Sequence, residues 1–382
     1  MKENTQIKVN NKVLIWARET LALSHNLVSK KTGISSKRIL ELEEGEDLPT
    51  IDELKEFSKL YKRTLATLLL NEPPTEKPIP KDRRTVDSKS IGNFHHKTIL
   101  AIRKARAMAN SFIELRNEFG FSINKLNFFA SIQENPKTVA YELHKLLNLS
   151  EIRNMSNIDL ALEGYIEKIE SLGVLVFQLS LTQDNLRGFS IVDETMPIIG
   201  IKRGGEPTTS KIFTLFHELG HILLNDSGLC DLTEFTNIEI EKWCNAFAAE
   251  ILIPTTELLQ IEKVIEQKQN AQNIWTKKDL IEIGNHFHSG PLAILRCLLE
   301  NNLTTKDFYQ EKHQQWNKPH FGKSKKPEGR NIPKETIKEK GRTYISLAFK
   351  AFDQNRIDLK DLSDFLGVKF SYISRTRQLL NA

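Results

Sequence analysis

Residues 211–224 read Lys-Ile-Phe-Thr-Leu-Phe-His-Glu-Leu-Gly-His-Ile-Leu-Leu, and this stretch indicates more about the fold than any other. Its apolar side chains recur with helical spacing, so the segment is predicted to form one helix. His217 and His221 are four residues apart and lie on one helix face, where both rings can reach a single metal ion. Glu218 points to the same side, where its carboxylate can take a proton from a metal-bound water.

The alternative is that both histidines are ordinary surface residues of an amphipathic helix, because a bare H-E-x-x-H pattern also arises by chance. The flanking residues argue against this alternative. They form an apolar stripe that predicts a largely buried helix, made of Ile212, Leu215, Phe216, Leu219, Ile222 and Leu223. Two histidines and a glutamate in a buried helix need polar partners, which a metal ion supplies.

The third metal ligand is expected to be a carboxylate, because two histidines, one carboxylate and a water form a known catalytic zinc set. It should come from the next predicted helix, within residues 239–254, which ends before its proline. Glu239, Glu241 and Glu250 compete for this role. Glu241 is favoured because it shares a helix face with Asn245, one turn away, which can support a ligand.

Both motif helices closely resemble those of the ImmA/IrrE family of zinc metallopeptidases. The resemblance is most specific over residues 213–224 and 241–254 and covers roughly residues 160–305. The chain departs from the family in one place. The family often has Glu-Ala before the asparagine, where this chain has Trp243-Cys244.

The resemblance implies an α+β, zincin-like domain over residues 158–305, similar to the active-site core of thermolysin, with a small sheet of three or more strands. It implies that His217, His221 and Glu241 bind Zn²⁺ and that Glu218 is the general base. Members of the family cleave repressors or act in stress and mobile-element control. The implied partner is therefore one chosen protein, such as a repressor or an antitoxin-like protein.

Residues 10–70 are predicted to form an N-terminal domain of five short helices. Ser24 and Ser35 or Ser36 suit helix N-caps, and Gly33 and Gly45 suit the helix ends that follow them. This spacing is typical of a helix-turn-helix and resembles the Cro/C1-type (XRE) family.

DNA binding by this domain would use four side chains near the start of its two central helices, namely His25, Ser36, Lys37 and Arg38. The alternative is a helix-turn-helix used for protein contact or dimerisation. Leu40 occupies an outward position where the family usually has a polar residue. Residues 1–70 carry twelve Lys and Arg against ten Asp and Glu, which is not a strongly basic surface.

The remaining segments are predicted from composition and periodicity. Residues 71–81 form a proline-rich linker, 82–157 a helical region, 311–342 a flexible basic linker and 343–382 a C-terminal helical segment. Residues 367–374 could form a second, degenerate helix-turn-helix turn, but core-packing helices are the favoured interpretation, and no internal repeat is predicted.

Three strands are predicted over residues 172–179, 186–193 and 197–202. They should form a sheet beside the metal helix. An extended peptide could add to an edge of this sheet near residues 197–202.

Composition places the protein in the cytoplasm. The apolar runs are too short to span a membrane, and the N-terminus lacks the apolar core of a secretory signal. Three widely spaced cysteines favour a reducing compartment, and Cys244 is predicted to be a buried core residue.

Together these features predict a multidomain, mainly α protein: a cytoplasmic zinc-dependent endopeptidase with a regulatory role and an N-terminal DNA-binding or partner-binding domain. The alternative is a transcriptional regulator or interaction protein whose metal site is structural or sensory. An intact Glu218 favours the enzyme, because a structural site needs no general base.

Overall fold

The computed structural model describes residues 5–76, 96–121, 125–181, 186–192, 195–224, 234–270, 275–316 and 331–381. The chain folds as two compact units, formed by residues 1–104 with 182–185 and by residues 105–181 with 186–382. The described residues leave out 77–81 of the proline-rich linker, 82–95 and 122–124 of the helical region, 317–330 of the basic linker and four stretches of the expected peptidase segment, 182–185, 193–194, 225–233 and 271–274. In the described ranges, no helix is both long and apolar enough to cross a bilayer.

The first unit holds the expected short helices α1 (Asn11–Glu19), α2 (His25–Thr32), α3 (Ser36–Glu44), α4 (Ile51–Tyr61) and α5 (Leu65–Leu68). The side chains of Ser24 and Ser35 cap α2 and α3, as predicted. Gly33 takes the left-handed conformation, with φ of 80°, in the three-residue turn between these two helices. The domain therefore has the short glycine turn of a helix-turn-helix.

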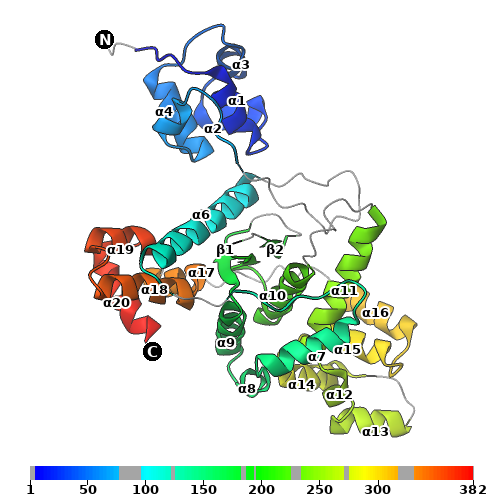
Figure 1. The fold of residues 1–382 in the computed structure, drawn as a ribbon. Helices are drawn as coiled ribbons and strands as arrows, with labels where there is room; N and C mark the ends of the chain where they lie inside the picture. The colour runs from blue at the N-terminus through cyan, green and yellow to red at the C-terminus, as the bar shows by residue number, and fades with distance from the viewer. Residues whose placement is uncertain are drawn as a thin grey trace. The chain divides into compact units, whose positions relative to one another are not determined.

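The second unit is larger and mainly helical (Figure 1). α6 (His96–Glu118) begins in the first unit and continues into the second. The helices that follow are α7 (Pro136–Leu146), α8 (Ser150–Arg153), α9 (Ile158–Ser171), α10 (Thr208–Leu223), α11 (Glu234–Leu252), α12 (Thr255–Leu258), α13 (Glu262–Asn270), α14 (Lys277–His286), α15 (Pro291–Glu300), α16 (Lys306–Trp316), α17 (Ile332–Lys340), α18 (Arg342–Asp353), α19 (Leu359–Leu366) and α20 (Phe370–Leu380).

The three expected strands form one sheet in the order β1-β3-β2, from β1 (Leu175–Leu179), β2 (Gly188–Ile191) and β3 (Ile198–Lys202). β3 is parallel to β1 and antiparallel to β2, so it lies in the centre with both edges paired. The prediction that a peptide adds near residues 197–202 is therefore wrong. Strand order is set by long-range pairing, which the local pattern of each strand does not contain.

Helices cover both faces of the sheet. α9 and α10 pack on one face, where Val176, Ile199 and Ile201 join the main core. On the other face, Phe177 of β1 meets Tyr344 of α18, which in turn stacks on Phe112 of α6. The sheet is therefore a buried layer that fixes the position of α10.

The C-terminal helices belong to this unit. α17 packs along β1, and its residues Pro333, Thr336 and Lys340 are buried. The prediction of a flexible linker over residues 311–342 is wrong for 311–316, which lie in α16, and for 332–340, which form α17. α17 depends on burial against β1 and α20, which composition alone does not report.

Candidate metal centre

α10 carries the two histidines and the following glutamate into the core. His217, Glu218 and His221 are 6%, 2% and 3% exposed, so the predicted burial of this helix is confirmed. The apolar stripe of α10 packs among the core residues of the second unit, which holds the polar residues at a fixed depth.

Gly220 allows α10 and α11 to approach closely. A Cβ atom at position 220 would lie 3.1 Å from Cys244 Sγ and 3.3 Å from Cys244 Cα. The missing side chain therefore lets the backbone of α11 lie against α10. This approach places Glu241 of α11 beside both histidines.

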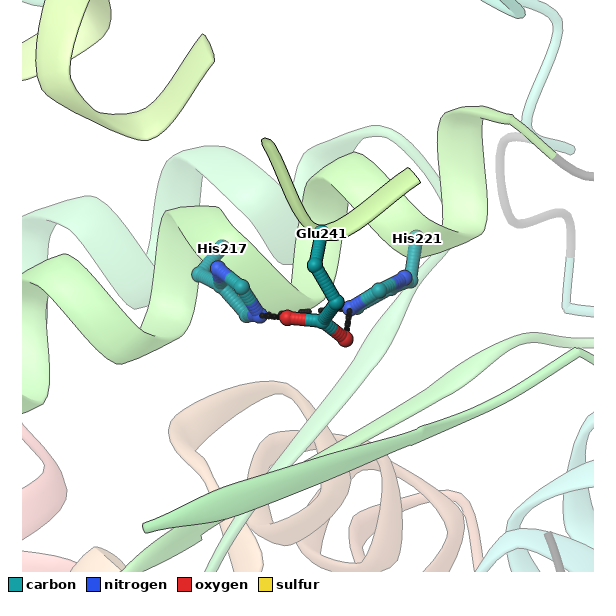
Figure 2. Close-up of side chains that lie close together, drawn as sticks. All are labelled: His217, His221 and Glu241. Carbon is teal, nitrogen blue, oxygen red and sulfur yellow. Dashed lines mark hydrogen bonds and ion pairs between the residues drawn. The ribbon is translucent and has the colours of Figure 1, made fainter. Parts of the chain in front are cut away.

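His217, His221 and Glu241 converge from the two helices, as Figure 2 shows. His217 Nε2 lies 3.2 Å from His221 Nε2 and 3.3 Å from Glu241 Oε2, while Glu241 Oε1 lies 3.2 Å from His221 Nε2. Ligand atoms about 2.0–2.1 Å from a tetrahedral zinc are separated by about 3.3–3.4 Å. The observed separations agree with that geometry, so the three residues fit a metal ion of this size.

The outer nitrogens of both imidazoles are also held. His217 Nδ1 lies 3.1 Å from Asn245 Oδ1. This oxygen can only accept, so Nδ1 carries the proton and Nε2 presents its lone pair inward. His221 Nδ1 lies 3.5 Å from Cys244 Sγ.

Cys244 is fully buried, as the sequence predicts, but its contact with His221 was missed. It is one of the two residues, with Trp243, at which the chain departs from the family pattern. The close approach of α10 and α11 at Gly220 creates this contact, and the glycine inside the histidine motif is the signal that could have indicated it.

The geometry selects Glu241 from the three competing acids. Glu239 is exposed, and the carboxylate of Glu250 accepts from the backbone N–H of Thr255 at 2.8 Å and from its hydroxyl at 2.6 Å. Burial favours the neutral form of Glu241, but the close contacts of its carboxylate with the rings of His217 and His221 outweigh burial and lower the pKa of Glu241 to about 2. Glu241 is therefore an anion facing the two rings.

Glu218 follows His217 on α10 and lies against the edge strand β2. A Cβ atom at Gly188 would lie 2.7 Å from Thr214 Cγ2 and 3.3 Å from Glu218 Cγ. Gly188 thus lets the backbone of β2 pass directly over α10 at the position of the predicted general base.

The residues predicted to contact DNA are arranged differently. Arg38 donates to Glu53 Oε1 at 2.9 Å and to the carbonyl of Leu48 at 3.1 Å, and it also pairs with Asp47. The hydrogen bond to Glu53 is the main reason that the pKa of Arg38 is raised above its ordinary value. Its guanidinium is therefore held within its own domain.

The other three predicted DNA contacts do not form one basic surface. His25 Nε2 lies 3.0 Å from Glu43 Oε2, and Ser36 Oγ donates to Asn26 Oδ1 at 3.0 Å. Lys37 projects into solvent, with its side chain 87% exposed. An open hollow of about 530 Å³ beside Arg38 is lined in part by Asp52, Glu53 and Glu56, so acidic groups surround this face.

Comparison with curated proteins found no match. A peptidase family model, described as the IrrE N-terminal-like domain, matches residues 169–293. This span contains the whole sheet, α10 and α11, and therefore all three converging residues. The match supports the resemblance to the ImmA/IrrE family for this part of the second unit and makes the converging residues a candidate metallopeptidase centre.

Proposed function

We propose that the protein is a zinc-dependent endopeptidase that cleaves a specific cytoplasmic protein and has a regulatory role. The observation that carries this proposal is the convergence of His217, His221 and Glu241 at separations that suit tetrahedral zinc. The family match over residues 169–293 supports the peptidase class.

The chain's own residues have separate tasks in peptide hydrolysis. Asn245 and Cys244 orient the two imidazoles, and the Glu241 carboxylate compensates positive charge. Zinc, when bound, supplies a water of lowered pKa and polarises the peptide carbonyl. Glu218 accepts a proton as water adds to the carbonyl carbon, and it returns the proton to the amine as the C–N bond breaks.

An extended peptide is expected to bind along β2. Among the described strands, only β3 pairs with β2, so the outer edge of β2 has backbone groups that a peptide can use. The outer edge of β1 is less suitable because α17 packs along that strand. Since Gly188 brings β2 against Glu218, a peptide on this edge would have its backbone near the general base.

Only an accessible, extended segment of a partner can bind such an edge, which favours one chosen substrate over bulk protein. A repressor or an antitoxin-like protein fits this requirement. We propose that residues 1–75 recruit this partner by direct protein contact. Their deletion should impair partner cleavage while leaving zinc bound, and casein should be a poor substrate with or without the deletion.

The test uses full-length wild type, Glu218→Gln and the control Glu239→Gln, which changes an exposed acid two residues from Glu241. Each is assayed for zinc content and used to capture partners from cell extract for mass spectrometry. The proposal expects one zinc in all three, a partner retained by Glu218→Gln, and its cleavage at one or a few sites by wild type and Glu239→Gln. Zinc in every protein with no cleavage by wild type would favour the structural or sensory alternative.

A further inference from the structure

The C-terminal pair α19–α20 repeats the local geometry of α2–α3. α2 and α19 are each eight residues long, and each is followed by a three-residue turn. The turns begin with glycines in the left-handed region, Gly33 with φ of 80° and Gly367 with φ of 67°. This is the short glycine turn of a helix-turn-helix.

The buried positions also correspond. Aligning N-cap residue Ser24 with N-cap residue Asp358 places Val28 on Leu362, Ile39 on Ile373 and Leu42 on Thr376. All six side chains are buried. Among these three buried pairs only Ile39 and Ile373 are identical, so the repeat is clearer in the structure than in the sequence.

The exposed faces of the two second helices differ in chemistry. α3 presents Leu40, Glu41 and Glu44, and its Arg38 is held by Asp47 and Glu53. At the positions equivalent to Leu40, Glu41 and Glu44, α20 presents the exposed residues Ser374, Arg375 and Gln378. Arginine and glutamine can form paired hydrogen bonds to guanine and adenine edges in the major groove, and serine can bond to several bases.

The charge of α20 complements a phosphate backbone. The helix has no acidic residue. Arg375 within the helix and Lys369, the residue just before it, are exposed. Arg375 donates to Gln378 at 3.0 Å, which holds both side chains on one face. The acidic residues of α19 are engaged within that helix, because Asp358 and Asp361 form its capping box and Asp364 lies 4.0 Å from Lys360.

The opposite side of α20 is fixed to the rest of the unit. Arg377 pairs with Asp353 and lies over the ring of Phe349, and Arg342 donates to the carbonyl of Leu380. α17 packs against the same helix. α20 therefore presents its exposed face from a rigid support, as a recognition helix requires.

We infer that α19–α20 is a second helix-turn-helix and that the exposed face of α20 binds duplex DNA in the major groove. Ser374, Arg375 and Gln378 contact base edges, and Lys369 contacts a phosphate. This activity is separate from the peptidase site, and it assigns DNA binding to the C-terminal helices instead of α3.

The experiment selects bound sequences from a random duplex pool of roughly 20–30 bp, using full-length Glu218→Gln protein. Fluorescence anisotropy then measures affinity at several salt concentrations. The variants, in the same background, are Lys369→Ala with Arg375→Ala, Arg375→Lys alone, Lys37→Ala on α3, and Lys145→Ala as an exposed cation on α7. Amide exchange of α20 checks that each variant is folded.

We expect the double variant to bind the selected duplex about 10- to 100-fold more weakly, with a smaller salt slope. Arg375→Lys should keep affinity for random duplex but lose sequence preference, because lysine cannot make the paired guanine contact in the same way. Lys37→Ala and Lys145→Ala should change affinity less than about twofold. The inference is overturned if folded full-length protein binds no duplex at low salt, or if Lys37→Ala weakens binding while the α20 double variant does not.

Discussion

The candidate metal centre of the second unit and the helix-turn-helix of the first unit both gather charged side chains, but in opposite ways. At the centre, two imidazole nitrogens and a carboxylate face one another at 3.2–3.3 Å. Around α3, each arginine or histidine faces a glutamate or aspartate that already satisfies it, as Arg38 does with Glu53. Two imidazole nitrogens and a carboxylate that face one another suit a bound cation, whereas matched ion pairs leave no place for one. The comparison teaches that converging ligand atoms indicate a ligand and that paired charges indicate structure.

The largest effect that sharpens this comparison is expected from removing one candidate metal ligand. His221→Ala should weaken metal binding by more than about 100-fold, because two remaining ligands hold the ion poorly and losing even a supporting group costs 10- to 100-fold. Isothermal titration of zinc into metal-stripped protein measures the change. Cys297→Ala, at a buried cysteine outside the cluster, is the control and should bind zinc as wild type does. Equal zinc affinity in His221→Ala and wild type would contradict the claim that His221 binds the ion.

Glu170 offers a second contrast, because it is a buried carboxyl without the histidines that surround Glu241. Burial raises the pKa of Glu170 to about 7, although the Thr343 hydroxyl donates to it. The folded protein therefore binds more protons than the unfolded chain between pH of about 4.5 and 7, and this group's contribution to stability is lost as pH rises through that window.

Glu170→Gln should remove this loss. As pH rises from 5 to 8, the free energy of unfolding of the variant should therefore increase relative to that of wild type by up to about 3 kcal/mol. Urea unfolding of both proteins at the two pH values measures the difference. Glu167→Gln changes a 53% exposed acid on the same helix and should follow the wild-type profile. Parallel profiles for Glu170→Gln and wild type would mean that burial does not govern this carboxyl.

A smaller effect is expected in the first unit. Arg38→Ala should destabilise α3 and α4 by about 1–2 kcal/mol, because it leaves the half-buried Glu53 without its guanidinium. Lys37→Ala should leave both helices unchanged, since its side chain is 87% exposed. Amide hydrogen exchange over residues 36–61 compares the two. Equal protection in both variants would show that Arg38 is not a structural residue and would return it to the candidates for DNA contact.

Local periodicity predicted most of the elements that build the site. The apolar stripe placed α10 correctly, and the β-branched runs placed β1, β2 and β3. The spacing to Asn245, together with the family resemblance, favoured Glu241. These features depend on residues a few positions apart, which is the range over which sequence patterns carry structural information.

Features that depend on distant residues were not predictable in the same way. The central place of β3 requires pairing with strands on both sides, and the contact of Cys244 with His221 requires α10 and α11 to meet at Gly220. Arg38 forms ion pairs across a turn with Asp47, which is 9 positions away, and with Glu53, which is 15 positions away. Helical periodicity within α3 does not contain such partners.

The central claim is that Glu241 completes the metal site with the two histidines. Native mass spectrometry of full-length wild type, Glu241→Ala, Glu239→Ala and Glu250→Ala, each purified with zinc in excess and then desalted, tests it most directly. The account predicts one zinc in wild type, Glu239→Ala and Glu250→Ala, and none in Glu241→Ala. A full equivalent of zinc in Glu241→Ala, with zinc lost from Glu239→Ala or Glu250→Ala, would contradict it.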